Sequence, residues 1–308
     1  MTVIDFASAR KSAARARAGV CDGRGRVALV FNPQSGQFSA SALAALSSAF
    51  EAAGLRVSRH DSLGFDCARE GPFQIICVAG GDGTLRDVMS ANADVGAARW
   101  CVFPAGTINL IAREADYPAE VAAFVRRVLA AAADAAPRWH YGARAGAGVF
   151  LACASVGPDA AVVGRVSLAL KRRIGRLAYV VALAAQLWAW PRHRIELTAD
   201  GERLAGEAVF VAKGHFYAGP WSLSPEAGLA GKDLHILLMP RARRRDFARL
   251  VLAAMSGWRW FADPAWQRRR VRRLRIGGTL GLPVQADGDI IGATPIEIAA
   301  AHLPQPFL

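Results

Sequence analysis

The glycine-rich turn at residues 80–84 constrains the fold of this chain more than any other feature. Before it, Ile75–Ala79 is a short apolar run with β-branched side chains, which is typical of a strand buried on both faces. After it, Leu85, Val88 and Met89 recur at helical spacing. The stretch "IICVAGGDGTLRDVMS" therefore predicts a strand, a tight turn and a helix, which is the repeating unit of a parallel sheet.

The sequence of the turn itself, "GGDGT", indicates an anion site. Gly80, Gly81 and Gly83 lack a Cβ, so a bulky group can approach the main chain closely. Unpaired N–H groups converge at the start of the following helix and attract phosphate. Asp82 would repel a bare phosphate, and its presence suggests that a divalent cation or a hydroxyl lies between the two. The alternative is a plain tight turn that binds nothing.

Two further turns have the same setting. Residues 26–33 form a strand-like run that leads into "NPQSG" at 32–36. Trp100–Phe103 likewise leads into "PAGTINLIAR" at 104–113. Strands that alternate with helices indicate a parallel sheet with helices on its faces, and such sheets bind ligands at the carboxyl ends of their strands. We therefore expect all three turns to share one edge of the sheet.

The second half of the chain has a different pattern. From about residue 139 short strands alternate with tight turns such as Asp200–Gly201, interrupted by one long helix at roughly 162–190. This pattern is typical of an antiparallel β-sandwich. The predicted organisation is a basic, flexible arm (1–24), a Rossmann-like α/β nucleotide-binding domain (25–138) and a β-sandwich domain with one long helix (139–308).

The charge of the chain favours anionic partners. The net charge is +13, and residues 241–275 alone contain twelve arginines and two acids. Trp258, Trp260, Phe261 and Trp266 are interleaved with these arginines, as suits an interface with anionic phospholipid. The alternative is a solvated arginine face whose tryptophans belong to the core. No nucleic-acid-binding module is recognisable, so we expect no nucleic-acid partner.

The cysteines and the apolar runs bear on the cellular compartment. The five cysteines are scattered without a CxxC pair, which argues against disulfides and against a zinc site. The N-terminus lacks the apolar core of a secretory signal. The longest nearly apolar run, at 177–190, is shorter than the ~20 residues needed to span a bilayer. We expect a cytoplasmic protein that attaches peripherally to the inner face of the membrane.

With the three turns in view, the chain resembles the diacylglycerol kinase catalytic-domain family, and its soluble bacterial lipid kinases in particular. "NPQSG", "GGDGT" and "GTINLIAR" occur in the order of the family's motifs. In the second half, "RRIGRLAY" at 172–179 and "VQADGD" at 284–289 look like two later motifs of the family. The resemblance extends over about residues 26–300.

The resemblance implies a two-domain kinase in which ATP lies in the cleft between the domains and a lipid hydroxyl takes the γ-phosphate. It also implies Mg²⁺, with Asp82 as the metal ligand and as a catalytic residue. The family's nucleotide contacts correspond to Asn32, Ser35, Gly36, Gly80, Gly81, Asp82, Gly83, Thr84, Gly106 and Thr107.

Three departures from the family pattern concern the chemistry. The catalytic acid of the late motif is usually glutamate and corresponds here to Asp289, with Asp287 as the alternative proton acceptor. Arg86 and Asp87 stand where the family commonly has Asn and Glu. Ala230 stands where many members have an aspartate tied to a structural magnesium, so we expect no structural metal ligand there.

These features together predict an ATP-dependent lipid kinase whose substrate lies in a membrane. Diacylglycerol is the first acceptor to consider, with phosphatidic acid as the product, and sphingoid or ceramide-type lipids are alternatives. Two other functions stay open, namely an NAD kinase-like phosphotransferase and a catalytically silent module that binds lipid surfaces. The sequence leaves the oligomeric state open between a monomer and a homodimer.

Overall fold

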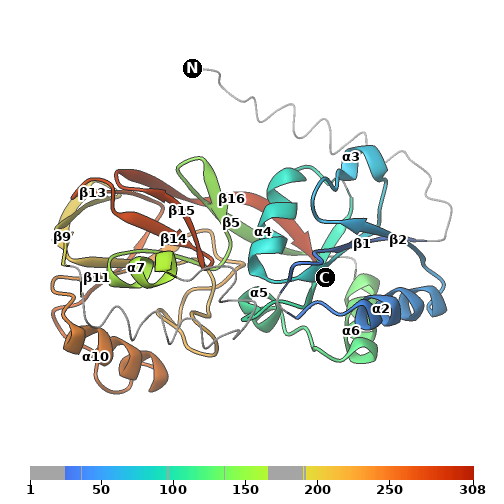
Figure 1. Cartoon of the computed structure of the whole chain (residues 1–308), viewed down its shortest axis with the longest axis horizontal. Helices are drawn as coiled ribbons and strands as arrows, with labels where there is room; N and C mark the ends of the chain where they lie inside the picture. Colours follow the sequence, from blue (N-terminus) through green and yellow to red (C-terminus); the bar gives the residue numbers. More distant parts are fainter. Residues whose placement is uncertain (1–24, 36, 96, 135, 166–189, 191) are drawn as a thin grey trace.

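The computed structural model describes residues 25–35, 37–95, 97–134, 136–165, 190 and 192–308. Two units lie side by side, an α/β unit built from the first half of the chain and a β-rich unit built from the second (Figure 1). The predicted arm at 1–24 and most of the predicted long helix at 162–190 fall outside the described residues.

The first unit contains the predicted parallel sheet. Its strands are β1 (Arg26–Phe31), β2 (Arg56–Asp61), β3 (Ile75–Gly80) and β4 (Arg99–Pro104). They lie in the order β2-β1-β3-β4, and all neighbours are parallel. β3 is buried along its whole length, as its continuous apolar sequence predicts.

Helices cover this sheet on its faces. They are α2 (Ala40–Ala52), α3 (Cys67–Glu70), α4 (Asp82–Ala91), α5 (Leu110–Glu114) and α6 (Val121–Ala133). The hydroxyl of Ser39 caps α2 by accepting the N–H of Ala42, and α2 packs against α6. Phe50 and Phe124, one from each of these helices, are fully buried.

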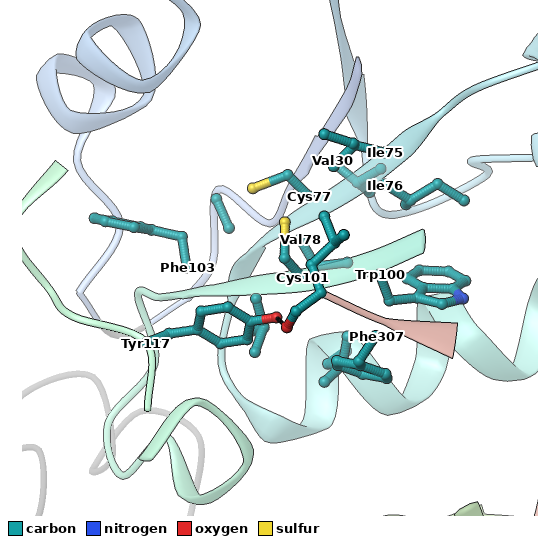
Figure 2. Close-up of a cluster of buried hydrophobic side chains, with 14 of the residues drawn as sticks. Val30, Ile75, Ile76, Cys77, Val78, Trp100, Cys101, Phe103, Tyr117 and Phe307 are labelled. Atoms are coloured by element: carbon teal, nitrogen blue, oxygen red, sulfur yellow. Dashed lines mark hydrogen bonds between the residues drawn. The ribbon is translucent and has the colours of Figure 1, made fainter. Parts of the chain in front are cut away.

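The core of the first unit includes the last residues of the chain (Figure 2). Cys77 and Cys101 face each other on β3 and β4 as buried free thiols. Below them in the figure, Phe307 packs beside Trp100, and the hydroxyl of Tyr117 donates to the carbonyl of Leu308 at 2.5 Å. The last two residues, Phe307 and Leu308, are therefore part of this core, which their neighbours in the sequence do not indicate.

The second unit contains a six-stranded antiparallel sheet in the order β12-β11-β10-β7-β14-β15. These strands are β7 (Cys153–Val156), β10 (Ala208–Ala212), β11 (Leu234–Met239), β12 (Gln267–Val271), β14 (Pro283–Ala286) and β15 (Asp289–Ala293). Its inner face packs on a second layer of strands through a shared apolar core that includes Phe150, Val211 and Ile236. The prediction of an α/β unit followed by an antiparallel sandwich is confirmed.

The second layer of the sandwich continues the sheet of the first unit. It consists of β5 (Arg138–Ala145), β6 (Gly148–Phe150), β8 (Ile195–Ala199), β9 (Glu202–Gly206), β13 (Arg273–Gly278) and β16 (Ile296–Phe307). β16 pairs with β5 and β13 in the sandwich, and its end pairs with β4 through Phe307 and Trp100. One continuous sheet thus runs through both units and fixes their relative position.

Two helices complete the second unit. α7 (Pro158–Arg165) is the described beginning of the predicted long helix. α10 (Arg244–Met255) was not predicted, because its arginines obscure the apolar positions that Leu250, Ala253 and Ala254 bury. α10 covers the outer face of the six-stranded sheet, at the far end of the molecule from α2 (Figure 1). Within the described ranges, no helix has both the length and the apolar character needed to cross a membrane.

Candidate active site

The three predicted turns lie at one edge of the sheet. They follow the carboxyl ends of β1, β3 and β4, which are neighbours in the sheet. The direction of the strand order reverses between β1 and β3, and ligands of open parallel sheets bind at such a switch point. Of the predicted contacts, Gly36 falls outside the described residues.

The first turn is tied to both of the others. Asn32 donates its Nδ2 hydrogen to the hydroxyl of Thr84 at 3.2 Å, and its Oδ1 accepts the N–H of Gln34 at 2.8 Å. The N–H of Ser35 closes the turn on the carbonyl of Asn32 at 3.0 Å, and the N–H of Gln37 donates to the carbonyl of Ala105 at 3.0 Å. The three turns therefore form one connected surface.

The second and third turns touch through their glycines. A Cβ on Gly106 would lie 2.3 Å from the Cα of Gly81, so neither turn tolerates a side chain at this contact. Asn109 adopts a left-handed conformation (φ 58°) and exchanges two hydrogen bonds of 2.8 Å with the main chain of Gly106. These glycines hold the turns together, while Gly80 packs against Thr84 and Thr107 is half-buried beside them.

Asp82 joins the second turn to α5. Its two carboxylate oxygens accept the N–H groups of Leu110 and Ile111, each at 2.9 Å. Burial raises the pKa of Asp82 to about 6, although the two hydrogen bonds lower it and the charge of Asp287 raises it further. The sequence suggested an acid exposed in a loop, whereas the carboxylate also caps the helix of the third turn.

Asp287 and Asp289 flank the tight turn between β14 and β15. Asp287 lies in the left-handed region (φ 48°), and its carboxylate accepts three main-chain N–H groups. The donors are Leu151 at 2.7 Å, Ala152 at 2.9 Å and Cys153 at 3.0 Å. This acid fixes the turn against the start of β7 and is poorly placed to accept a further proton.

Asp289 instead faces the glycine turn of the first unit. Its side chain is 42% exposed, and its Oδ2 lies 3.3 Å from the point that a Cβ on Gly83 would occupy. An acid of the sandwich therefore lies directly over the "GGDGT" loop of the α/β unit. Asp289 of the second unit thus lies beside Gly83, the residue that follows Asp82 in the first unit.

Arg86 of α4 contacts the second unit at the same place, and no role for it was predicted from the sequence. Its Nη2 donates to the Oδ2 of Asp289 at 3.2 Å, and its Nε donates to the carboxylate of Asp87 at 2.9 Å. Its Nη1 contacts the carbonyl of Ala286 at 3.4 Å, and the side chain is only 12% exposed. The one available signal was a cation in the first helical turn after the loop.

A second buried cationic side chain, Lys213, binds the loop that contains Ala230. Lys213 is fully buried, and its ammonium donates to the carbonyls of Gly228 at 3.2 Å and Leu229 at 3.1 Å. The carboxylate of Glu114, at the end of α5, accepts the N–H of Leu229 at 2.5 Å. Burial lowers the pKa of Lys213 to about 8, against the opposing charges of Glu114 and Asp233. Sequence reasoning missed both residues, because the contact joins positions far apart in the chain.

The carboxylates of this site bear on whether it can hold a metal ion. Among the residues that the structure describes, no three His, Cys, Asp or Glu side chains converge as a metal site. Protein-bound Mg²⁺ commonly takes only one or two carboxylates and completes its shell with water and substrate phosphates. The carboxylate of Asp82, at the start of α4, suits that second mode, in which the ion arrives with a nucleotide and Asp82 is its protein ligand. The loop at Ala230 does not fit a metal, because an ammonium already binds its carbonyls.

The arrangement suits transfer of a phosphoryl group. Such transfer depends on positioning and on charge stabilisation more than on covalent participation of the protein. The start of α4 and the nearby guanidinium of Arg86 would supply positive charge for phosphate oxygens. Asp289 lies on the opposite wall, where it could accept a proton from an attacking alcohol.

Comparisons with protein families cover both halves of the chain. Residues 26–137 match the family model "Diacylglycerol kinase catalytic domain". Residues 152–306 match the model "YegS C-terminal NAD kinase beta sandwich-like domain", which alone covers half of the chain.

Individual proteins are similar over most of their length. A "Probable lipid kinase YegS-like" of Pseudomonas putida is 28% identical over 75% of this chain and 77% of its own. The diacylglycerol kinase of Bacillus subtilis is 24% identical over 88% of this chain and 92% of its own. A crystal structure of a diacylglycerol kinase from Bacillus anthracis superposes with a TM-score of 0.71 at 19% identity, covering 94% of this chain and 99% of that one, which shows a shared fold.

Proposed function

This chain belongs to the diacylglycerol kinase catalytic-domain family of lipid kinases, and we propose that it transfers the γ-phosphate of ATP to the hydroxyl of diacylglycerol, giving phosphatidic acid. Family membership makes it an ATP-dependent phosphotransferase, whereas the acceptor is our proposal. The observation that supports the proposal is the position of Asp289 over Gly83, where a carboxylate of one unit lies against the glycine-rich turn of the other.

In the proposed mechanism the turns around Asn32, Gly81 and Gly106 bind the phosphates of ATP through their N–H groups and hydroxyls. Mg²⁺, bound to the phosphates and held on the protein side by Asp82, would neutralise phosphate charge. Asp289 takes the proton of the lipid hydroxyl as that oxygen attacks the γ-phosphorus. ADP then leaves with the bridging oxygen.

The acceptor is best identified without a prior choice of lipid. The purified full chain would be incubated with radiolabelled ATP, Mg²⁺ and a total lipid extract, and the labelled product identified. Label in phosphatidic acid supports the proposal, and label in a sphingoid or ceramide phosphate replaces its acceptor. Labelled NADP from added NAD, with no labelled lipid, would favour an NAD kinase-like enzyme. Binding to vesicles without turnover of ATP would favour the silent lipid-binding module.

We further propose that the segment after α10 binds the enzyme to the cytoplasmic face of an anionic membrane. Two aromatic residues of the segment after α10 turn inward, since Trp258 donates its indole N–H to the carbonyl of Ser222 and makes an edge-to-face contact with Trp266. The other two turn outward, with Trp260 69% and Phe261 53% exposed. Exposed aromatics within an arginine-rich segment suit a phospholipid interface.

Replacing both Trp260 and Phe261 by Ser is expected to weaken binding to phosphatidylglycerol-containing vesicles by at least ~10-fold, because two aromatic side chains no longer leave water. Sedimentation with vesicles measures this change. Turnover of a short-chain, dispersed substrate should stay the same. The matched control is Leu63→Ser, which removes an 80% exposed side chain from the other unit. Equal binding by wild type and the double variant would exclude this surface.

A further inference from the structure

Two positions at which this chain departs from its family's pattern touch each other in the structure. Asp289 replaces the usual glutamate, and Arg86 replaces the common asparagine. We propose that Arg86 is a positioning residue that holds the shorter acid at the phosphate loop, so that the two departures compensate for each other. The inference rests on the proposed kinase function, because Asp289 is the proton acceptor of that reaction.

Arg86 contacts both ends of the turn between β14 and β15, which carries Asp289. Its Nη1 contacts the carbonyl of Ala286, before the turn, and its Nη2 pairs with Asp289, after it. Asp87 holds the Nε edge of the same guanidinium at 2.9 Å. A planar guanidinium bound on three sides has a fixed orientation, which an ammonium on a flexible stem would not have.

The ion pair with Arg86 compensates for the side chain of Asp289, which is one methylene shorter than the usual glutamate. An aspartate reaches less far than a glutamate, and a displacement of about 1 Å at a reacting group can cost ~10²-fold in rate. The turn cannot move closer by itself, because Asp287 fixes it through three main-chain N–H groups. Arg86 is the fifth residue of α4, about one helical turn after Gly83, and its pairing with Asp289 holds that carboxylate beside Gly83.

A double-mutant cycle tests this compensation. Arg86→Asn alone is expected to lower kcat by ~10- to 100-fold and to change KM for ATP less than about threefold. Asp289→Glu alone also lowers kcat, since the longer acid meets a guanidinium placed for the shorter one. The double variant R86N/D289E carries the family's common pair and should recover kcat to within about tenfold of wild type.

The matched control is Arg59→Asn, which removes an exposed arginine of β2 and should leave kcat unchanged. Independent, multiplying losses in the two single variants would overturn the proposal and leave Arg86 a structural role only. If wild type phosphorylates no lipid, the proposed function fails by that result alone. Melting temperatures then test the ion pair by themselves. Arg86→Asn should lower the Tm of wild type, and it should leave the Tm of the Asp289→Asn variant unchanged.

A different observation carries a second inference, about the loop at residues 228–231. We infer that the ammonium of Lys213 replaces a structural metal ion in this loop. A fully buried lysine is rare unless it is paired, and this one binds two main-chain carbonyls as a cation would. Ala230 offers no metal ligand beside them.

The loop at residues 228–231 contacts both units, so the ammonium of Lys213 bound to it contributes to the stability of that contact. The carbonyl of Leu229 accepts the N–H of Tyr141 at 2.9 Å in addition to the bond from Lys213. Glu114 of the α/β unit binds the N–H groups of Leu229 and His215. Leu229 itself is buried in the core of the first unit. Lys213 therefore stabilises the contact across which the cleft is built.

Melting of the full chain tests this inference without any turnover. The Tm of wild type should be the same in excess EDTA and in excess Mg²⁺. Lys213→Met should lower it by ~6–10 °C, with no recovery on adding Mg²⁺. Lys232→Met, an exposed lysine of the same segment, is the matched control and should change it little.

A gain of metal dependence completes the test. Lys213→Ala with Ala230→Asp removes the ammonium and restores a carboxylate, so Mg²⁺ should raise the Tm of this double variant. A wild-type Tm that falls on chelation would show that a metal stabilises the loop after all and would overturn the inference.

Discussion

Replacing Asp289 by asparagine is expected to lower kcat for lipid phosphorylation by ~10²- to 10⁴-fold, which is the usual contribution of general acid–base catalysis. The amide is nearly the same size as the carboxylate but cannot accept the proton of the attacking alcohol. Because the proposed mechanism assigns the phosphates of ATP mainly to the turns of the other unit, the Kd for ATP should change less than about threefold. Single-turnover kinetics and calorimetric titration with ATP measure the two effects separately.

Asp287→Asn provides the contrast. Its carboxylate accepts three main-chain N–H groups, and an amide in its place would direct its own hydrogens at one or more of these donors. We expect this variant to lose stability as well as activity, whereas Asp289→Asn should melt like wild type. Wild-type turnover in Asp289→Asn would move the proton acceptor elsewhere and remove the main support for the proposed mechanism.

Local features of the fold could be predicted from sequence because their signals lie in neighbouring residues. A buried strand such as β3 has a continuous apolar sequence, and the glycines of "GGDGT" mark the turn that follows it. The common edge of the three turns followed from the general behaviour of parallel sheets. The antiparallel sandwich likewise followed from the alternation of short strands and tight turns in the second half of the chain.

Contacts between distant positions could not be predicted in the same way. The end of β16 enters the first core because Phe307 pairs with Trp100, and nothing in the local sequence of either residue indicates this. The direction of a side chain is equally hidden, since Asp82 belongs to a recognisable loop but turns toward α5. The pairs Arg86–Asp289 and Lys213–Leu229 also depend on the folded chain.

Helix α10 shows a different limit. Its periodic apolar positions are present, but three arginines within the helix and two just before it made the segment resemble a charged surface run. The side chains of Arg243 and Asp246 form a capping pair at its start, at 2.7 Å between Nε and Oδ2. Charge patterning thus concealed a helix whose cap and buried face are both encoded in the sequence.

Asp82→Ala should have the largest effect of all, a loss of turnover of at least ~10³-fold together with a lower Tm. The Tm falls because the carboxylate holds the N–H groups of Leu110 and Ile111 at the start of α5. Leaving buried donors without acceptors costs about 1–3 kcal/mol. For a chain of this size we therefore expect Tm to fall by several degrees, ~2–4 °C per kcal/mol.

The chain offers a matched control for separating the two losses. Asp66 caps α3 in the same manner, accepting the N–H groups of Ala68 at 2.9 Å and Arg69 at 3.3 Å, but it lies outside the candidate site. Asp66→Ala should lower Tm and leave kcat per folded molecule unchanged. If Asp82→Ala behaved like Asp66→Ala in both respects, Asp82 would be a helix cap only. Turnover well below that of Asp66→Ala at equal folded fraction would instead place its carboxylate in the reaction, because capping alone cannot explain such a difference.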